Sequence, residues 1–417
     1  MSEKHSLKTT QETFLMNLID MDNKEQIKSI PEEFRPEVII NYDKDINGAI
    51  DINLRFNSTL SKERKKKENK NSLYKNILIL FTDGLSRVQF IRKLPKTSQF
   101  LSKFMKYKGN SFRYNGKKNV FHGFEFLKYH SMLLTTMGNE IPMIYGRKFD
   151  EDEAYDINKY FQENGYITGI ANEQCGKDSV PAEWCKKNGK IIPRKGSYHD
   201  HEFYGLACDP FHGIGWKADR GMSSPYRRCL YGKMIIEHEI EYAKQFFEKY
   251  KNNQKYFRLI ILDSHDNGTG QLINFDDEIL FNFLDYIFKN NYLNNGALLF
   301  LSDHGNTTNR IFYIFNDYML ERFLPYLYII LQDDNNKTYD KQYEYIIRNQ
   351  QTFIYPYDIY NTLSNIIYGE KYHLIKNKSE TLDTPKSKRG KSLLGYINPT
   401  RDCAKLNDFG QNCYCKL

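Results

Sequence analysis

The sequence lacks any long apolar stretch. Its longest apolar runs, such as residues 77–81 (ILILF) and 297–301 (ALLFL), are the size of a β-strand, whereas a membrane-spanning helix needs roughly 20 apolar residues. The amino-terminal segment MSEKHSLKTTQETF also lacks the apolar core of a signal peptide. The sequence therefore predicts a chain with no membrane span and no signal peptide.

The cysteines lack the spacing of a four-ligand zinc site, because Cys413 and Cys415 form the only close pair. The other cysteines are Cys175, Cys185, Cys208, Cys229 and Cys403. Three of the seven fall in the last fifteen residues, where a short tail gains most from a covalent cross-link. This crowding predicts disulfides and an oxidising compartment, although no signal peptide precedes them.

Positive charge is concentrated in only one place. The formal net charge is +8, and the one dense basic run is residues 62–70 (KERKKKENK). Glu and Asn interrupt this run, and no aromatic residue for base stacking is interleaved with it. We therefore expect residues 1–74 to be an arm ending in a solvated basic linker, with no nucleic acid as partner.

From Lys75 onward, short apolar runs alternate with segments of helical spacing. The predicted strands are residues 76–81, 166–171, 256–262, 297–301 and 325–331. The predicted helices are residues 96–107, 152–164, 232–250 and 276–290. Runs that are apolar on both faces are typical of central parallel strands, and this alternation predicts an α/β fold with a mostly parallel sheet.

Acidic residues and histidines follow three of the predicted strands. Asp83 follows the first, Asp263 and His265 follow the third, and Asp303 with His304 follows the fourth. The carboxyl ends of parallel strands meet at one edge of the sheet, where ligands bind. A single Asp in this position is more often a helix cap, and a single His is more often structural. Their joint occurrence favours a metal site.

A metal at this edge activates a hydroxyl as a nucleophile when a Ser or Thr lies beside it. The pattern offers Ser86, Thr135 and Thr136 and does not choose among them.

The same residues resemble a known family. Residues 78–97 (LILFTDGLSRVQFIRKLPKT) look like the opening block of a sulfatase-like family of unknown function that is abundant in nematodes and belongs to the alkaline phosphatase superfamily. A second block of that family is similar to residues 135–146. Further blocks follow in the family's order at residues 165–168, 228–229, 265–266, 302–305, 320–325 and 401–415.

The resemblance implies a fold and a division of the chain. The fold is an alkaline phosphatase-like three-layer sandwich, with a mostly parallel central sheet and helices on both faces. Residues 75–370 are expected to form the catalytic domain, and residues 371–417 a cysteine-containing tail packed on it. The family and the tail cysteines together predict an extracellular or secretory-pathway location.

The resemblance also implies the roles of individual residues. It places the nucleophile on Thr136 and a phosphate-contacting amide on Asn139. The implied ligands of one divalent metal, zinc or manganese with calcium as a further candidate, are Asp83, Thr136, Asp303 and His304. Members with two metals carry an Asp four residues before the His, where this chain has Ile261. His265 is therefore expected to contact the substrate or a weak second ion.

The expected activity is hydrolysis or transfer of a phosphate ester on a small molecule, lipid or glycan. Sulfatases of this superfamily convert a Cys or Ser to formylglycine within a Cys-x-Pro-x-Arg type of motif, which this sequence lacks. The alternatives are a sulfuric ester hydrolase and an inactive binding protein. Met137-Gly138 replaces the family's Phe-Pro after the nucleophile, and this change predicts a looser turn.

Overall fold

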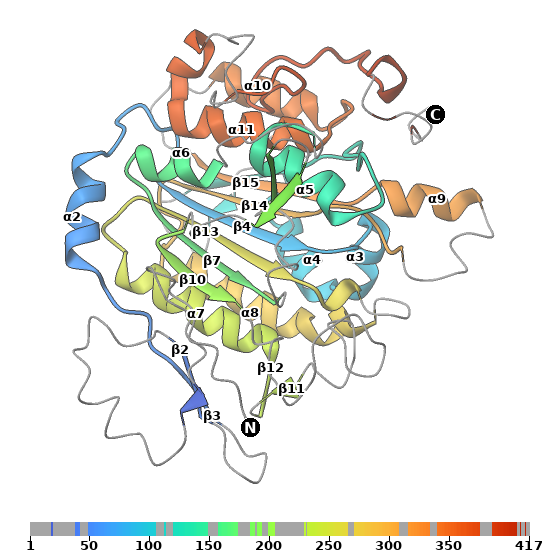
Figure 1. The fold of residues 1–417 in the computed structure, drawn as a ribbon. Coiled ribbons are helices and arrows are strands. Elements are labelled where there is room, and N and C mark those ends of the chain that lie inside the picture. The colour runs from blue at the N-terminus through green and yellow to red at the C-terminus, as the bar shows by residue number, and fades with distance from the viewer. Residues whose placement is uncertain are drawn as a thin grey trace.

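An eight-stranded sheet forms the middle of the computed structural model (Figure 1). In order across the sheet, the strands are β10 (His201–Tyr204), β7 (Ile167–Asn172), β13 (Lys255–Ile261), β4 (Asn76–Thr82), β14 (Gly296–Ser302), β15 (Leu327–Asp333), β6 (Val120–Glu125) and β5 (Phe112–Arg113). The structure describes residues 51–105, 120–148, 157–173, 199–204, 232–265, 271–307, 316–333, 340–375 and 386–406, together with shorter pieces at 18–19, 38–41, 49–50, 112–113, 184–187, 190–193, 229–230, 409 and 413.

The sheet is mostly parallel, as predicted. Strands β10, β7, β13, β4 and β14 pair in parallel, and β15 then runs antiparallel to both β14 and β6. Strand β6 consequently points the same way as β14, and the short β5 runs antiparallel to it. All five strands predicted from the sequence are present, with ends within two residues of the prediction.

Helices cover both faces of this sheet (Figure 1). Helices α3 (Arg87–Lys93), α4 (Pro95–Ser102), α7 (Ile235–Lys249) and α8 (Asp277–Lys289) lie on one face. Helices α5 (Thr136–Tyr145), α6 (Ile157–Glu163), α10 (Asp340–Asn349) and α11 (Pro356–Tyr368) lie on the other. Side chains alternate between the faces of a strand: in β4, Leu78 and Leu80 join the first core and Ile77 and Ile79 join the second. The predicted three-layer α/β architecture is confirmed.

The remaining elements are smaller. Three minor sheets contain β1 (Leu18–Ile19), β2 (Val38–Asn41) and β3 (Ala49–Ile52); β8 (Trp184–Lys187) and β9 (Lys190–Pro193); and β11 (Cys229–Leu230) and β12 (Lys233–Met234). The other helices are α2 (Ser58–Lys66), α9 (Asn316–Phe323), η7 (Asp263–His265), η8 (Leu272–Asp276), η10 (Gly369–Leu374) and η11 (Cys403–Lys405). Every helix in the described part of the chain is too short or too polar to cross a membrane.

Part of the predicted basic linker is a helix instead. Helix α2 begins at a cap, because the Asn57 side chain accepts a hydrogen bond from the Leu60 amide at 2.9 Å. Arg64 forms an ion pair of 2.5 Å with Asp200, and the Ser61 hydroxyl bonds to Asn253. These contacts attach α2 to the domain, while most of its lysines remain exposed. Most of the arm before residue 51 lies outside the described residues.

The described part of the tail is attached to α11 and cross-linked. Arg401 pairs with the buried Asp358 of α11 at 3.1 Å. A disulfide joins Cys403 to Cys413, and Cys403 is buried against aromatic side chains that include Phe409. The side chains of the other five cysteines lie outside the described part of the chain.

One buried ion pair joins α5 to the sheet. Glu140, on α5, accepts a hydrogen bond from Arg258, in β13, and both side chains are almost completely buried. Removing one partner of a buried pair leaves an uncompensated charge in a medium of low dielectric constant. The pair therefore fixes α5 relative to the strand that leads to His265.

We predict that Glu140→Ala lowers the free energy of unfolding by about 3 to 5 kcal/mol, the cost typical of breaking a buried pair. Urea denaturation of the two proteins measures the difference. The matched control is Glu278→Ala, which breaks an exposed pair with Lys96 and is expected to change stability little. Equal effects of the two substitutions would show that the buried pair does not anchor α5.

Candidate metal centre

Two neighbouring strands bring two carboxylates together at the carboxyl edge of the sheet. In the register of β4 with β14, Thr82 lies opposite Ser302, so the next residues, Asp83 and Asp303, leave the sheet side by side. Both are buried, and Asp303 has 0% of its surface exposed. Two carboxylates held together in the interior repel each other unless a cation lies between them.

The two carboxylates each keep one oxygen without a hydrogen-bond partner. Asp303 Oδ1 accepts hydrogen bonds from the Gly84 amide at 3.0 Å and the His304 amide at 2.8 Å. Asp303 Oδ2 and Asp83 Oδ1 are buried and accept none. They lie 3.2 and 3.6 Å, respectively, from His304 Nε2. These orphaned oxygens face the same ring nitrogen.

The two histidines complete this group from different elements. His304 Nδ1 lies 2.8 Å from the Gly305 carbonyl oxygen, so Nδ1 carries the hydrogen and Nε2 presents its lone pair to the carboxylates. His265, from η7, is 18% exposed, and its Nε2 is 4.0 Å from Asp83 Oδ1. Asp83, His265 and His304 each offer one possible ligand atom, and these three atoms all lie within 4.8 Å of one another.

These spacings fit a first-row divalent ion. Ligand atoms about 2.0 Å from a tetrahedral ion lie about 3.3 Å from one another, close to the 3.2 and 3.6 Å separations at His304. The pKa of Asp303 is raised to about 6, chiefly by burial; the neighbouring Asp83 carboxylate adds to the rise, whereas His304 and the hydrogen bonds from two backbone amides oppose it. A bound cation removes this penalty, because it stabilises both carboxylates in their charged form.

Gly84 is required for the close approach of the histidines, a role that the sequence pattern alone does not assign to it. Its φ is +74°, in the left-handed region that glycine adopts readily. A Cβ at this position would lie 3.2 Å from the His265 ring. The signal was present as the Asp-Gly pair directly after an apolar strand. The pattern assigns no role to Ser264 either; its hydroxyl donates to the Asp83 carbonyl oxygen at 2.5 Å and ties η7 to the end of β4.

Of the three candidate hydroxyls, Thr136 faces the carboxylates. Ser86 caps α3 by accepting from the Gln89 amide, and Thr135 caps α5 by accepting from the Gly138 amide. Thr136 is the first residue of α5, and its hydroxyl donates to Asp83 Oδ2 at 3.1 Å. It is also partly exposed, so a substrate can reach it. The structure thus brings Asp83, Thr136, His265, Asp303 and His304 into one site.

The Asn139 side chain, which was expected to contact phosphate, is hydrogen-bonded within its own turn. Its Oδ1 accepts from the amides of Met132 (2.6 Å) and Leu133 (3.3 Å). Its Nδ2 donates to the carbonyl oxygens of Leu133 (2.6 Å) and Thr135 (2.9 Å). A carboxamide has two donor hydrogens and two acceptor lone pairs, so all four positions are occupied. The buried Asn139 side chain therefore holds the turn before Thr136.

The turn at Met137-Gly138, which was expected to be looser, is closed by several contacts. A Cβ on residue 138 would lie 2.5 Å from Leu133 Cδ1, so glycine lets the Leu133 side chain pack directly against the start of α5. The Thr135 cap and the four bonds of Asn139 close the same turn. These contacts hold the backbone that presents Thr136.

Comparison with known proteins identifies a family. Residues 6–417 match the model of a family described as "Protein of unknown function (DUF229)". This match confirms the family of unknown function predicted from the motifs. Among proteins with curated descriptions, none matches the sequence.

Several solved structures of bacterial proteins are similar to this chain. Lipoteichoic acid synthase LtaP from Listeria monocytogenes is 10% identical, with a TM-score of 0.45 and 82% of each chain covered. The C-terminal periplasmic domain of EcEptC from Escherichia coli is 10% identical, with a TM-score of 0.45, 77% of this chain and 93% of that chain covered. A protein in the alkaline phosphatase superfamily from Vibrio parahaemolyticus is 13% identical, with a TM-score of 0.41. The match covers 66% of this chain and 68% of that chain. Similarities this distant do not decide a function.

We predict that Asn139→Ala lowers the free energy of unfolding by about 1 to 3 kcal/mol, because buried backbone groups of the turn lose their partners. Thermal or urea denaturation without metal or substrate measures this loss. Asn282→Ala, in an exposed turn of α8, is the matched control and is expected to leave stability unchanged. Full stability of Asn139→Ala together with weaker substrate binding would instead support the role as a substrate contact.

Proposed function

We propose that this chain, which belongs to the family of proteins of unknown function DUF229, is a metal-dependent hydrolase or transferase of phosphate esters. One observation carries the proposal. The Thr136 hydroxyl lies 3.1 Å from one oxygen of Asp83, and the other oxygen of Asp83 faces His304. A hydroxyl beside a cluster of metal-binding groups is the arrangement that nucleophilic catalysis requires.

The proposed ligands of one divalent ion are Asp83, Asp303 and His304, with Thr136 as the fourth. Mixed oxygen and nitrogen ligands suit zinc or manganese, and the oxygens also suit calcium. When bound, the ion withdraws charge from phosphate oxygens and lowers the pKa of a coordinated hydroxyl. His265 is close enough to Asp83 to join the same ion, and its partial exposure also lets it contact a substrate. A weak second ion remains the other proposed use of His265.

The proposed reaction proceeds through Thr136. Its Oγ1 attacks phosphorus, so a bond from threonine oxygen to phosphorus forms while the ester bond to the alcohol breaks. The Thr136 hydroxyl gives up its proton as the new bond forms, and the departing alcohol oxygen takes up one proton in return. Water in a hydrolase, or a second alcohol in a transferase, then attacks the phosphorus and returns the hydroxyl to Thr136. The first turn of the ten-residue helix α5 places positive partial charge beside the transferring group.

One feature supports phosphate rather than sulfate as the transferred group. The nucleophile position holds Thr136, whereas formylglycine is made from Cys or Ser. Neither alternative is favoured by a specific contact in the described site. The assay described below can therefore also identify the chain as a sulfuric ester hydrolase or as an inactive binding protein.

The proposed substrates are esters of small molecules, lipids or glycans, and the proposed location is extracellular or within the secretory pathway. The disulfide between Cys403 and Cys413 supports such an oxidising compartment.

We predict that Thr136→Ala lowers kcat at least about 1000-fold on bis(p-nitrophenyl) phosphate or p-nitrophenyl phosphate, as loss of a nucleophile does. Assays contain added zinc or manganese, and p-nitrophenyl sulfate serves as the sulfate ester. Thr136→Ser keeps a hydroxyl and is expected to retain measurable turnover. Mass spectrometry of quenched reactions is expected to find phosphothreonine at position 136.

Three results would count against this account. Full activity of Thr136→Ala would remove the nucleophile assignment. Faster turnover of the sulfate ester would favour the sulfuric ester hydrolase. Bound metal without turnover of any ester would favour the inactive binding protein.

A further inference from the structure

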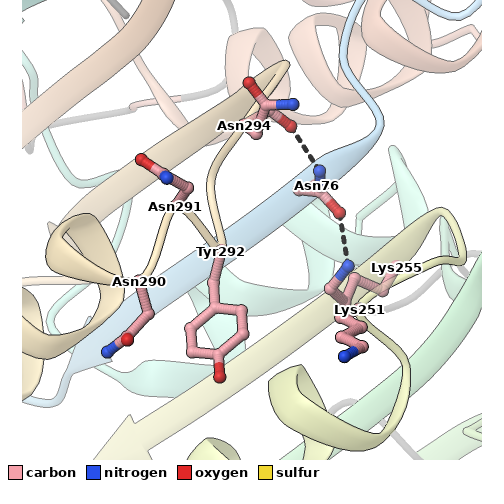
Figure 2. Close-up of a pocket in the computed structure, with 7 residues that line it drawn as sticks. All are labelled: Asn76, Lys251, Lys255, Asn290, Asn291, Tyr292 and Asn294. Atoms are coloured by element: carbon pink, nitrogen blue, oxygen red, sulfur yellow. Dashed lines mark hydrogen bonds between the residues drawn. The ribbon is translucent and has the colours of Figure 1, made fainter. Parts of the chain in front are cut away.

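A second polar site lies at the opposite edge of the sheet from Asp83. It is a pocket of about 420 Å³ at the amino ends of β4 and β13 and beside the loop that precedes β14 (Figure 2). Strand β4 runs from Asn76 at this pocket to Thr82 at the catalytic edge. Seven residues at about 3.3 Å each separate the two sites by roughly 23 Å. The pocket is therefore distinct from the candidate metal centre.

Lys255 forms the base of this pocket. It is the first residue of β13 and only 1% exposed. Its ammonium group donates to Asn76 Oδ1 at 2.6 Å and to the Asn253 carbonyl oxygen at 3.0 Å. The Asn76 amide in turn donates to the Asn294 carbonyl oxygen, as Figure 2 shows. An ammonium group has three donor hydrogens, so a third remains beyond these two hydrogen bonds; the group also lies 5.9 Å from the centroid of the Phe247 ring, which carries no formal charge.

This buried ammonium has no carboxylate partner. Within the part of the chain that the structure describes, no Asp or Glu lies within 4.0 Å of Lys255 Nζ. Buried lysines are almost always paired with an acid. Burial alone lowers the pKa of Lys255 to about 7, which reflects the cost of holding a positive charge there without a counterion.

The rest of the lining is also rich in donors. Four of the seven lining residues are asparagines, and none is acidic. Lys251, four residues before Lys255, contributes a second ammonium from the exposed turn, and Tyr292 contributes a hydroxyl. Two positive side chains and several neutral donors surround one cavity (Figure 2). Such a lining is complementary to an anion that has several acceptor oxygens.

We propose that this pocket binds a tetrahedral oxyanion, a phosphate or sulfate group, carried on a small polar molecule. Its volume falls in the range of about 300 to 1,000 Å³ that small-molecule pockets occupy, and it exceeds what the anion alone fills. The anion supplies the counter-charge that Lys255 lacks. Lys251 closes the outer side of the anion, and the amide groups bind the attached polar part.

The proposal is independent of catalysis at Thr136 and does not rest on it. The competing explanation is that Lys255 only ties the start of β13 to the start of β4 through Asn76 and the turn at Asn253. A purely structural lysine gives no saturable binding of an oxyanion. Binding measurements therefore separate the two explanations.

The test is isothermal titration calorimetry of the whole chain with sodium sulfate, inorganic phosphate and glucose 6-phosphate as probes. We expect saturable binding of one sulfate per pocket. Tighter binding of the sugar phosphate identifies a small organic ester as the ligand, and equal affinity identifies the free oxyanion. No saturable binding of any of the three probes would overturn the proposal.

The affinity for sulfate is also expected to depend on pH. Sulfate keeps its charge between pH 6 and 8, whereas the protonated fraction of a group with a pKa of about 7 falls from about nine tenths to about one tenth. The other titratable groups around Lys255 are Lys251, Tyr292 and, at the start of β4, Lys75. Binding is expected to be about tenfold weaker at pH 8 than at pH 6. An affinity that rises with pH would contradict the role of Lys255.

Variants locate the binding in this pocket. Lys255→Met removes the charge at similar volume and is expected to abolish binding, and Lys251→Met, in an exposed position, is expected to weaken it several-fold. Lys75→Met is the matched control, because Lys75 is exposed, pairs with Glu68 and does not line the pocket. Sulfate binding that survives both Lys255→Met and Lys251→Met would refute the site.

A further variant keeps this test separate from the proposed catalytic centre, which also attracts phosphate. Asp303→Ala removes a proposed metal ligand and is expected to leave binding at the Lys255 pocket unchanged. Loss of all oxyanion binding in Asp303→Ala would assign it to the metal centre and overturn the proposal. Absence of ester turnover with binding at Lys255 intact would affect the proposed function alone.

Discussion

The juxtaposition of Asp83 and Asp303 in the interior is the constraint on which the candidate site depends. Their positions follow from one register, because Thr82 of β4 pairs with Ser302 of β14 and the next residue of each strand is the aspartate. The hydrogen bonds of the central sheet therefore fix the separation of the two carboxylates. Burial makes this arrangement costly without a cation, and the raised pKa of Asp303 expresses that cost.

The surrounding structure is built to keep these carboxylates in place and to bring other groups to them. Gly84 lets the chain turn sharply enough for His265 to approach, and the buried pair of Glu140 with Arg258 holds α5 against β13. Asn139 then fixes the turn that presents Thr136 to Asp83. The proposed nucleophile and the proposed metal ligands thus come from separate elements, each attached to the same sheet.

Much of this architecture was predictable from the sequence because it depends on local patterns. Residues 76–81 are apolar on both faces, which is typical of a central strand, and β4 is such a strand. The acidic residues after β4 and β14 were identifiable as site candidates for the same reason. Strand β6 was missed because its sequence, VFHGFE, contains polar residues, although all six are buried. Glu125 of this strand is compensated by an ion pair with Arg87 that only the fold reveals.

The details that sequence patterns did not predict depend on contacts between distant or irregular segments. Asn139 was expected to contact phosphate, but the carbonyl and amide groups of the turn at Leu133 and Thr135 use its whole hydrogen-bonding capacity. The choice of Thr136 over Thr135 required a family resemblance, because neighbouring hydroxyls differ only in which side of the turn they face. The burial of Lys255 was not predictable from the sequence, because a lysine at the start of a strand is normally exposed.

The most direct test of the metal centre is anomalous X-ray diffraction from crystals of the whole chain grown with zinc or manganese. The account predicts one strongly bound ion, about 2.0 to 2.2 Å from an oxygen of Asp83, an oxygen of Asp303 and Nε2 of His304. The position of His265 in the same map decides whether it is a further ligand or lies beyond the ion. An ion bound only elsewhere, or no ion at a saturating concentration, would contradict the account.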